Sequence, residues 1–121
     1  MLEEIKLKYN HFHDADICEI KFSKTNNIAK IELVIECVNS QKEYGANYEK
    51  IKLVFKDLIF FNINYQQNID FVVFQTLIEK KDEIVVFDFD CDPVGENFQK
   101  ENINSRFIIK CKEVSYEVLT T

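Results

Sequence analysis

The fold is decided by residues 28–38, IAKIELVIECV, whose side chains alternate between an apolar face and a mostly charged face. The apolar face holds Ala29, Ile31, Leu33, Ile35 and Cys37, and the opposite face holds Lys30, Glu32 and Glu36. A period of two is typical of a β-strand that buries one face and exposes the other. The segment therefore predicts a half-buried strand.

The same alternation recurs along most of the chain. It predicts strands at 5–9, 16–22, 49–56, 83–91 and 106–112. The apolar run DLIFFNINY continues the strand at 49–56, and 114–118 is either a final strand or a continuation of 106–112 after a bulge. Turn-forming residues separate these runs at 23–27, 39–47, 80–82 and 92–97.

Segment 68–79 fits two interpretations. Ile69, Val72, Val73 and Leu77 have the spacing of one helical face, whereas the Ile, Phe and Val content favours a strand. We expect a strand here and leave open a short helix near 69–79.

Regular short strands with turns between them predict an all-β or β-dominated α+β fold. The 121 residues fit a single domain over 1–121. We expect six to eight antiparallel strands in a curled sheet or a sandwich, since a flat single sheet would leave one face too exposed.

Composition excludes several classes of protein. Hydrophobic residues make up 46% and charged residues 30%, which is typical of a globular chain rather than a disordered one. No apolar run is long enough for a membrane span, and the first residues lack a signal peptide, so the expected location is the cytoplasm. The four cysteines, at 18, 37, 91 and 111, form no C-x-x-C pair, which favours reduced core thiols over a zinc site.

The net charge of −6 lies in one stretch of the chain. Residues 82–101 contain seven acids and one base, and the remainder is balanced. This distribution argues against a nucleic-acid ligand and predicts an acidic face that attracts a basic protein, unless the acids belong only to a solvated loop. The expected contact residues on this face are Asp88, Asp90, Asp92 and Glu96. Tyr44, Tyr48 and Phe98 are candidate aromatic anchors, or loop residues that fold onto the sheet.

The segment HFHD, residues 11–14, holds both histidines of the chain. His11, His13 and Asp14, together with Asp88 and Asp90, would suit a metal site in a binding domain or a hydrolase. The simpler interpretation is that Asp14 caps a turn while a histidine packs at a strand entrance. Because no catalytic or phosphate-binding motif is present, we expect no enzymatic activity and no cofactor.

Two runs carry a resemblance to a known family. The first is FHDADI at 12–17, followed by Ile20 and Phe22, and the second is RFIIKCKEVSYEV at 106–118. Together they resemble the opening and closing strands of the bacterial immunity protein fifty family, whereas 39–81 shows no match. The resemblance implies a cytosolic, mostly β domain that binds and blocks a toxin, and it implies no catalytic residues. A homo-oligomer formed through an exposed strand edge is the third functional class that we consider.

Overall fold

The computed structural model describes residues 1–43, 47–64, 71–73, 75–93 and 99–120. The chain begins with the helix α1 (Leu2–Lys8) and the 3-10 turn η1 (Asn10–Phe12). The strands that follow are β1 (Ala15–Thr25), β2 (Ile28–Val38), β3 (Tyr48–Ile63), β4 (Phe71–Val73), β5 (Leu77–Lys81), β6 (Ile84–Asp88), β7 (Asp92–Pro93), β8 (Gln99–Lys100) and β9 (Phe107–Thr120).

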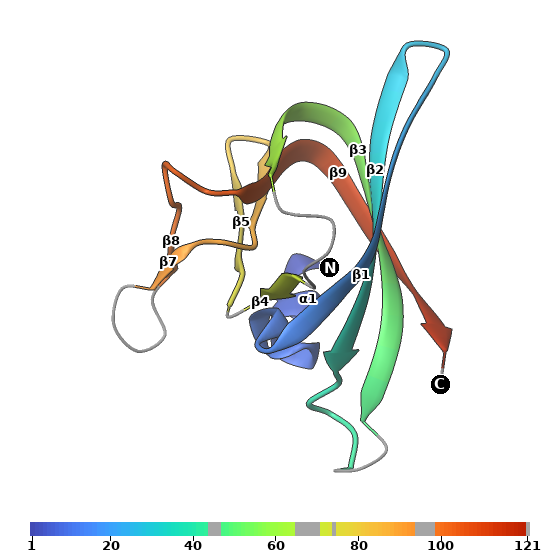
Figure 1. Cartoon of the computed structure of the whole chain (residues 1–121), viewed down its shortest axis with the longest axis vertical. Helices are drawn as coiled ribbons and strands as arrows, with labels where there is room; N and C mark the ends of the chain where they lie inside the picture. The colour runs from blue at the N-terminus through green and yellow to red at the C-terminus, as the bar shows by residue number, and fades with distance from the viewer. Residues whose placement is uncertain (44–46, 65–70, 74, 94–98, 121) are drawn as a thin grey trace.

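Seven of these strands form one antiparallel sheet in the order β4-β1-β2-β3-β9-β6-β5. The sheet curls into a half-barrel, and β7 and β8 form a separate two-stranded ribbon (Figure 1). The β-dominated class, the strand number and the curled sheet are therefore confirmed. The strand 28–38 is also confirmed, since β2 alternates as expected and buries Ile31, Leu33, Ile35 and Cys37.

The prediction of a strand at 5–9 is wrong, because these residues belong to α1 and to its C-cap at Tyr9. Ile5 and Tyr9 are four residues apart, so a helix places both on one face, and both are buried. Leu7, which the strand pattern put beside them, is 70% exposed. Glu3 and Glu4 in the first turn and Lys6 and Lys8 in the last turn complement the helix dipole.

The short helix that we left open near 69–79 is not formed by the described residues there. Residues 71–73 form β4, and residues 77–81 form β5. The β-branched and aromatic content of this segment outweighs its partial helical spacing. The expectation of a strand is thus confirmed for these two pieces.

A bulge in β1 changes the position of Cys18. The register with β2 shifts between Ile17 and Glu19, so Cys18 lies at the surface instead of in the core. The other cysteines are buried or half-buried, and all four are free. Burial, together with the nearby Glu49, raises the pKa of the Cys37 thiol to about 12.

β3 and β9 bend together and carry the sheet over the helix (Figure 1). Asp57 adopts a left-handed φ of 54°, and the register shifts between Leu58 and Phe60. The apolar continuation of β3 through residue 63 is therefore confirmed, with a bulge at the bend. Residues 114–118 are the predicted continuation of the preceding strand, since β9 runs unbroken from Phe107 to Thr120.

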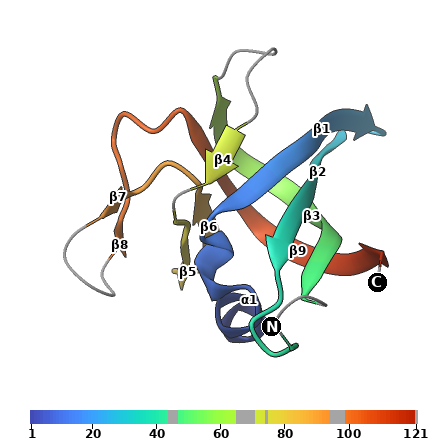
Figure 2. The ribbon, with the colours of Figure 1, turned by 60° about the horizontal axis from the view of Figure 1, so that its bottom comes forward.

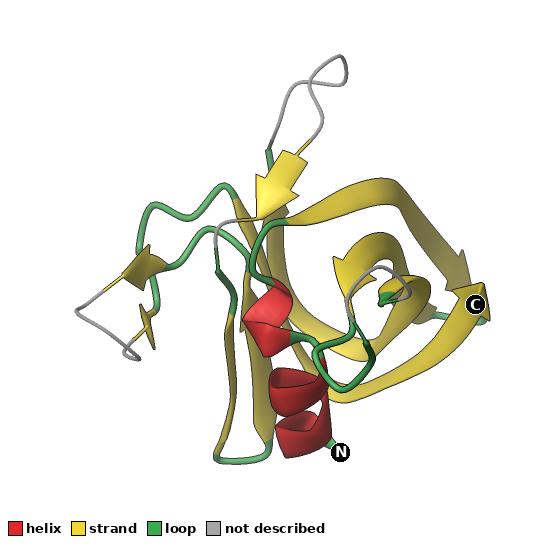
Figure 3. Cartoon of the chain, turned by 90° about the horizontal axis from the view of Figure 1, so that it is seen from below, coloured by secondary structure: helices red, strands yellow, loops and turns green. Residues whose placement is uncertain are grey.

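Aromatic side chains from the helix and the sheet meet in the core. The helix lies at the open side of the curl, beside β5 (Figure 2, Figure 3). The ring of Phe12 lies 6.3 Å from that of Phe89, which in turn lies 5.2 Å from Phe107. None of the helices in the described ranges is long and apolar enough to cross a bilayer.

Candidate functional site

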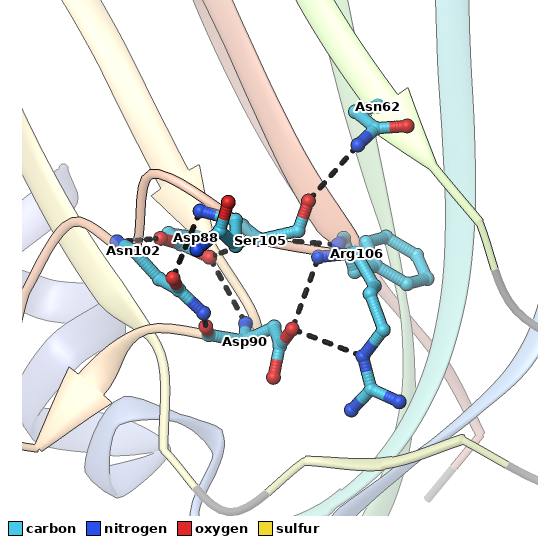
Figure 4. Close-up of polar contacts among 8 residues, drawn as sticks. Asn62, Asp88, Asp90, Asn102, Ser105 and Arg106 are labelled. Carbon is cyan, nitrogen blue, oxygen red and sulfur yellow. Dashed lines mark hydrogen bonds and ion pairs between the residues drawn. The ribbon is translucent and has the colours of Figure 1, made fainter.

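The carboxylate of Asp88 lies at the end of β6 and is fully buried. Its Oδ1 accepts hydrogen bonds from Ser105 Oγ at 2.6 Å and from the Asp90 amide at 3.0 Å. Its Oδ2 accepts a bond from the amide of Asn102 at 2.9 Å (Figure 4). One side chain thus fixes three points of the chain around the end of its strand.

Asp90 adds a second set of bonds to the same loop. Its Oδ2 accepts bonds from the Arg106 amide at 3.0 Å and from Arg106 Nε at 3.2 Å. Its carbonyl oxygen accepts a bond from Asn102 Nδ2 at 2.9 Å. Asn62 Nδ2 on β3 donates to the carbonyl of Ser105 at 2.9 Å (Figure 4). We call residues 101–106 the stapled loop, because these bonds tie it to both β6 and β3.

Holding this loop requires the carboxylate of Asp88 to be buried, which is electrostatically unfavourable. Burial raises the pKa of the Asp88 carboxyl group, and the bonds from Ser105, Asn102 and Asp90 oppose that rise. A carboxylate is taken out of water only where enough donors replace its hydration. Asp88 is therefore a positioning residue for the stapled loop.

The stapled loop presents an apolar side chain to solvent. Ile103 is 92% exposed, more than any other large hydrophobic residue of the described chain. Beside it lies a hollow of about 270 Å³, lined in part by Phe60, Ile108 and Lys110. Lys110 Nζ lies 5.9 Å from the centre of the Phe60 ring and 3.2 Å from Glu101 Oε2. The site thus combines an exposed aliphatic tip, an aromatic wall and an ion pair.

The structure corrects the predicted acidic face. Asp88 does not lie on the surface, and Asp90 is bound to Arg106, so neither carboxylate is presented as expected. Asp92 is exposed, and Glu96 lies outside the described residues. The expectation failed because a carboxylate at a strand end can accept backbone N–H groups as well as face water.

The aromatic anchors are placed only in part. Tyr44 and Phe98 lie outside the described residues. Tyr48, at the start of β3, is 65% exposed, and its role in binding stays a prediction. Ile103 and Phe60 were missed by the sequence argument, although the Asn and Ser residues of NINSR, 102–106, are typical of a loop with local side-chain bonds.

The histidine segment forms a connection between α1 and β1. His13 Nε2 lies 3.3 Å from Asp14 Oδ2, while the backbone carbonyl of His11 accepts a bond from the Thr76 amide at 2.9 Å. Asn10, His11, Phe12 and Asp14 all have positive φ. Within the part of the chain that the structure describes, no group of three His, Cys, Asp or Glu side chains could hold a metal ion. The predicted cluster with Asp88 and Asp90 is therefore not assembled.

A second buried carboxylate, Glu49 on β3, was also missed. It accepts bonds from Tyr9 Oη and Asn39 Nδ2, and it pairs with Lys42 Nζ, each at 2.8 Å. Burial would raise the pKa of Glu49, but these three donors outweigh it and lower the pKa to about 2. The alternation of β3 already places Glu49 on the same face as Ile51, which is the signal that could have found it.

Comparison of the chain with protein-family models, with curated protein sequences and with solved structures gave no significant match.

Proposed function

We propose that this chain is a protein-binding module that docks its partner through the stapled loop. The observation that carries the proposal is the exposure of Ile103 on a loop fixed by a buried carboxylate. An isolated exposed aliphatic residue is ordinary on a protein surface. Ile103, however, is 92% exposed on a loop that Asp88 and Asp90 hold in place, which is better explained if its side chain contacts a binding partner.

A fixed loop favours binding because less conformational freedom is lost when the complex forms. Ile103 would enter an apolar pocket of the partner, while a partner side chain would fill the hollow beside Phe60 and Lys110. The Glu101–Lys110 ion pair would lie at the rim of this contact. Asp88 would contribute indirectly, by holding the amide of Asn102 in place.

The partner that we favour is a basic protein, and the immunity role expected from the family resemblance remains our leading proposal for it. The net charge of −6 favours attraction to a basic toxin domain at long range. In the described chain, Asp82, Glu83 and Asp92 are exposed acids of the acidic stretch. Binding would block the toxin sterically, without chemistry on this chain.

The test compares two variants in which an exposed aliphatic residue becomes glutamate. Wild-type chain, Ile103→Glu and Leu7→Glu would each be exposed to a lysate of the source cells, and captured proteins identified by mass spectrometry. Leu7 is the matched control, since it is 70% exposed on α1, away from the loop. We expect the wild type and Leu7→Glu to retain one basic protein, and Ile103→Glu to lose it. Equal capture by Ile103→Glu would remove the stapled loop from the proposal.

A further inference from the structure

β3 extends beyond the strand that pairs with its first half. β2 pairs with β3 only as far as Lys56, opposite Lys30, whereas β9 pairs with the other edge of β3 as far as Ile63. Among the described residues, no strand lies along the second edge of Leu58–Ile63. We call this segment the open edge of β3.

The open edge carries no charged side chain. Its sequence is LIFFNI, and Ile59, Phe60 and Phe61 are 47%, 51% and 44% exposed. Natural sheets usually protect an exposed edge with lysine, proline or a very short strand, because unpaired backbone groups attract other strands. The terminal strand β5 follows that rule, since it ends in Glu79, Lys80 and Lys81. The open edge of β3 lacks this protection.

The backbone of the open edge is directed to accept another strand. The amide of Asn64 donates to the carbonyl of Arg106 on the β9 side at 2.7 Å. In an antiparallel pair, hydrogen-bonding residues alternate along each strand, so Asn62 and Phe60 also direct their amides toward β9. Phe61 and Ile63 therefore direct their N–H and C=O groups toward the open edge.

We infer that the open edge of β3 pairs antiparallel with the same edge of a second copy of this chain, about a two-fold axis at Phe61. The inference goes beyond the proposed function. Phe60 and Asn62 of the open edge also line the hollow beside Ile103, whereas Phe61, at the axis, does not line it. The register places Phe61 opposite its own copy on the inner face and Phe60 opposite Asn62 on the outer face. A second copy fits this edge because the two-fold register brings only uncharged side chains together, so the contact places no charges of the two negative chains against each other. A two-fold contact of this kind closes on itself and forms a dimer.

Sedimentation velocity of the full chain over a range of concentrations tests the inference. We expect the mass to double as concentration rises, and the dimer to tighten at high salt, because salt screens the repulsion between the two negative chains. Phe61→Lys places two lysines against each other at the axis, so its dimer should dissociate at least about tenfold more readily. Phe22→Ala is the control, because it loses the same ring contact, 5.6 Å between Phe22 and Phe61, without introducing a charge beside the edge. It should dimerise like the wild type.

A mixture of two oppositely charged variants tests the two-fold register directly. Phe61→Lys mixed with Phe61→Glu should form a heterodimer, since the opposite charges then meet at the axis. If these variants do not fold, amide hydrogen exchange of the wild type decides: the Phe61 amide should gain protection with concentration, while that of Asn62 should not change. A monomer mass at all concentrations and both salt levels overturns the inference, as do equal effects of Phe61→Lys and Phe22→Ala.

Discussion

Glu49→Gln removes one negative charge from the buried contact among α1, the β2–β3 connection and β3. The pKa of Glu49 falls from 4.5 in the unfolded chain to about 2 in the folded chain. Each pKa unit corresponds to about 1.36 kcal/mol, so the ionised carboxylate stabilises the fold by about 3 kcal/mol at neutral pH. This is a large part of the free energy of unfolding of a typical domain, roughly 5–15 kcal/mol. We expect Glu49→Gln to lose this stabilisation, which corresponds to a fall in Tm of roughly 10 °C.

The sign of the pH dependence follows from the direction of the pKa change. Because the folded chain lowers the pKa of Glu49, the stabilisation is fully present above pH 4.5 and is lost as the pH falls toward 2. Wild-type chain and Glu49→Gln should therefore differ most at neutral pH and converge in strong acid. Urea unfolding followed by circular dichroism at a series of pH values measures both effects.

Glu43→Gln is the matched control for this experiment. It makes the same chemical change at an exposed position in the same connection between β2 and β3. Its free energy of unfolding should stay within about 0.5 kcal/mol of the wild type at every pH. The reasoning is refuted if Glu49→Gln is as stable as Glu43→Gln at neutral pH, or if their stabilities fall in parallel in acid.

Three further predictions concern other parts of the chain. Asp88→Ala leaves the amides of Asn102 and Asp90 without an acceptor, so we expect a loss of about 3 kcal/mol and faster amide exchange at Asn102. In the native chain, one thiol should react fastest with a thiol reagent, the half-buried Cys91 more slowly, and the buried Cys37 and Cys111 only in denaturant; Cys18→Ser should abolish the fastest reaction, because Cys18 is the exposed cysteine. Asn27→Gly should stabilise the β1–β2 hairpin by up to about 1 kcal/mol in thermal unfolding, whereas Asn27→Ala should destabilise it, because Asn27 has a φ of 64°.

The sequence predicted the strands correctly where apolar and polar residues alternate strictly. The prediction failed where the same residues fit both the spacing of a strand and the spacing of a helix. Residues 28–38 alternate without interruption, and β2 formed there as expected. The alternating pattern is satisfied by Ile5, Leu7 and Tyr9, but Ile5 and Tyr9 also have the spacing of one helical face. Packing of these two side chains in the core favours the helix. Cys18 was misplaced because a one-residue bulge reverses the direction of a side chain, and nothing local in the sequence marks it.

The candidate site could be predicted only as a region. The concentration of acids in 82–101 pointed to the end of β6, but the direction of each carboxylate depends on contacts with Asn102, Ser105 and Arg106. Those partners come from a loop whose path is set by the β6–β9 pairing, and this pairing is not local in sequence. The sequence therefore located the acids but mistook their role.

The contacts that these acids make within the chain limit how the net charge can attract a partner. Asp88 is buried, Asp90 is paired with Arg106, and Glu101 is paired with Lys110, so three acids of the 82–101 stretch are engaged within the chain. A buried or paired charge contributes less to an attractive contact surface than a solvated one, although it still counts in the field felt from a distance. Attraction of a basic partner would consequently act mainly on the rate of association, while the apolar contact of Ile103 would set the lifetime of the complex. Salt should then slow association with such a partner, whereas it should strengthen self-association through the open edge of β3, so the two proposed contacts respond to ionic strength in opposite directions.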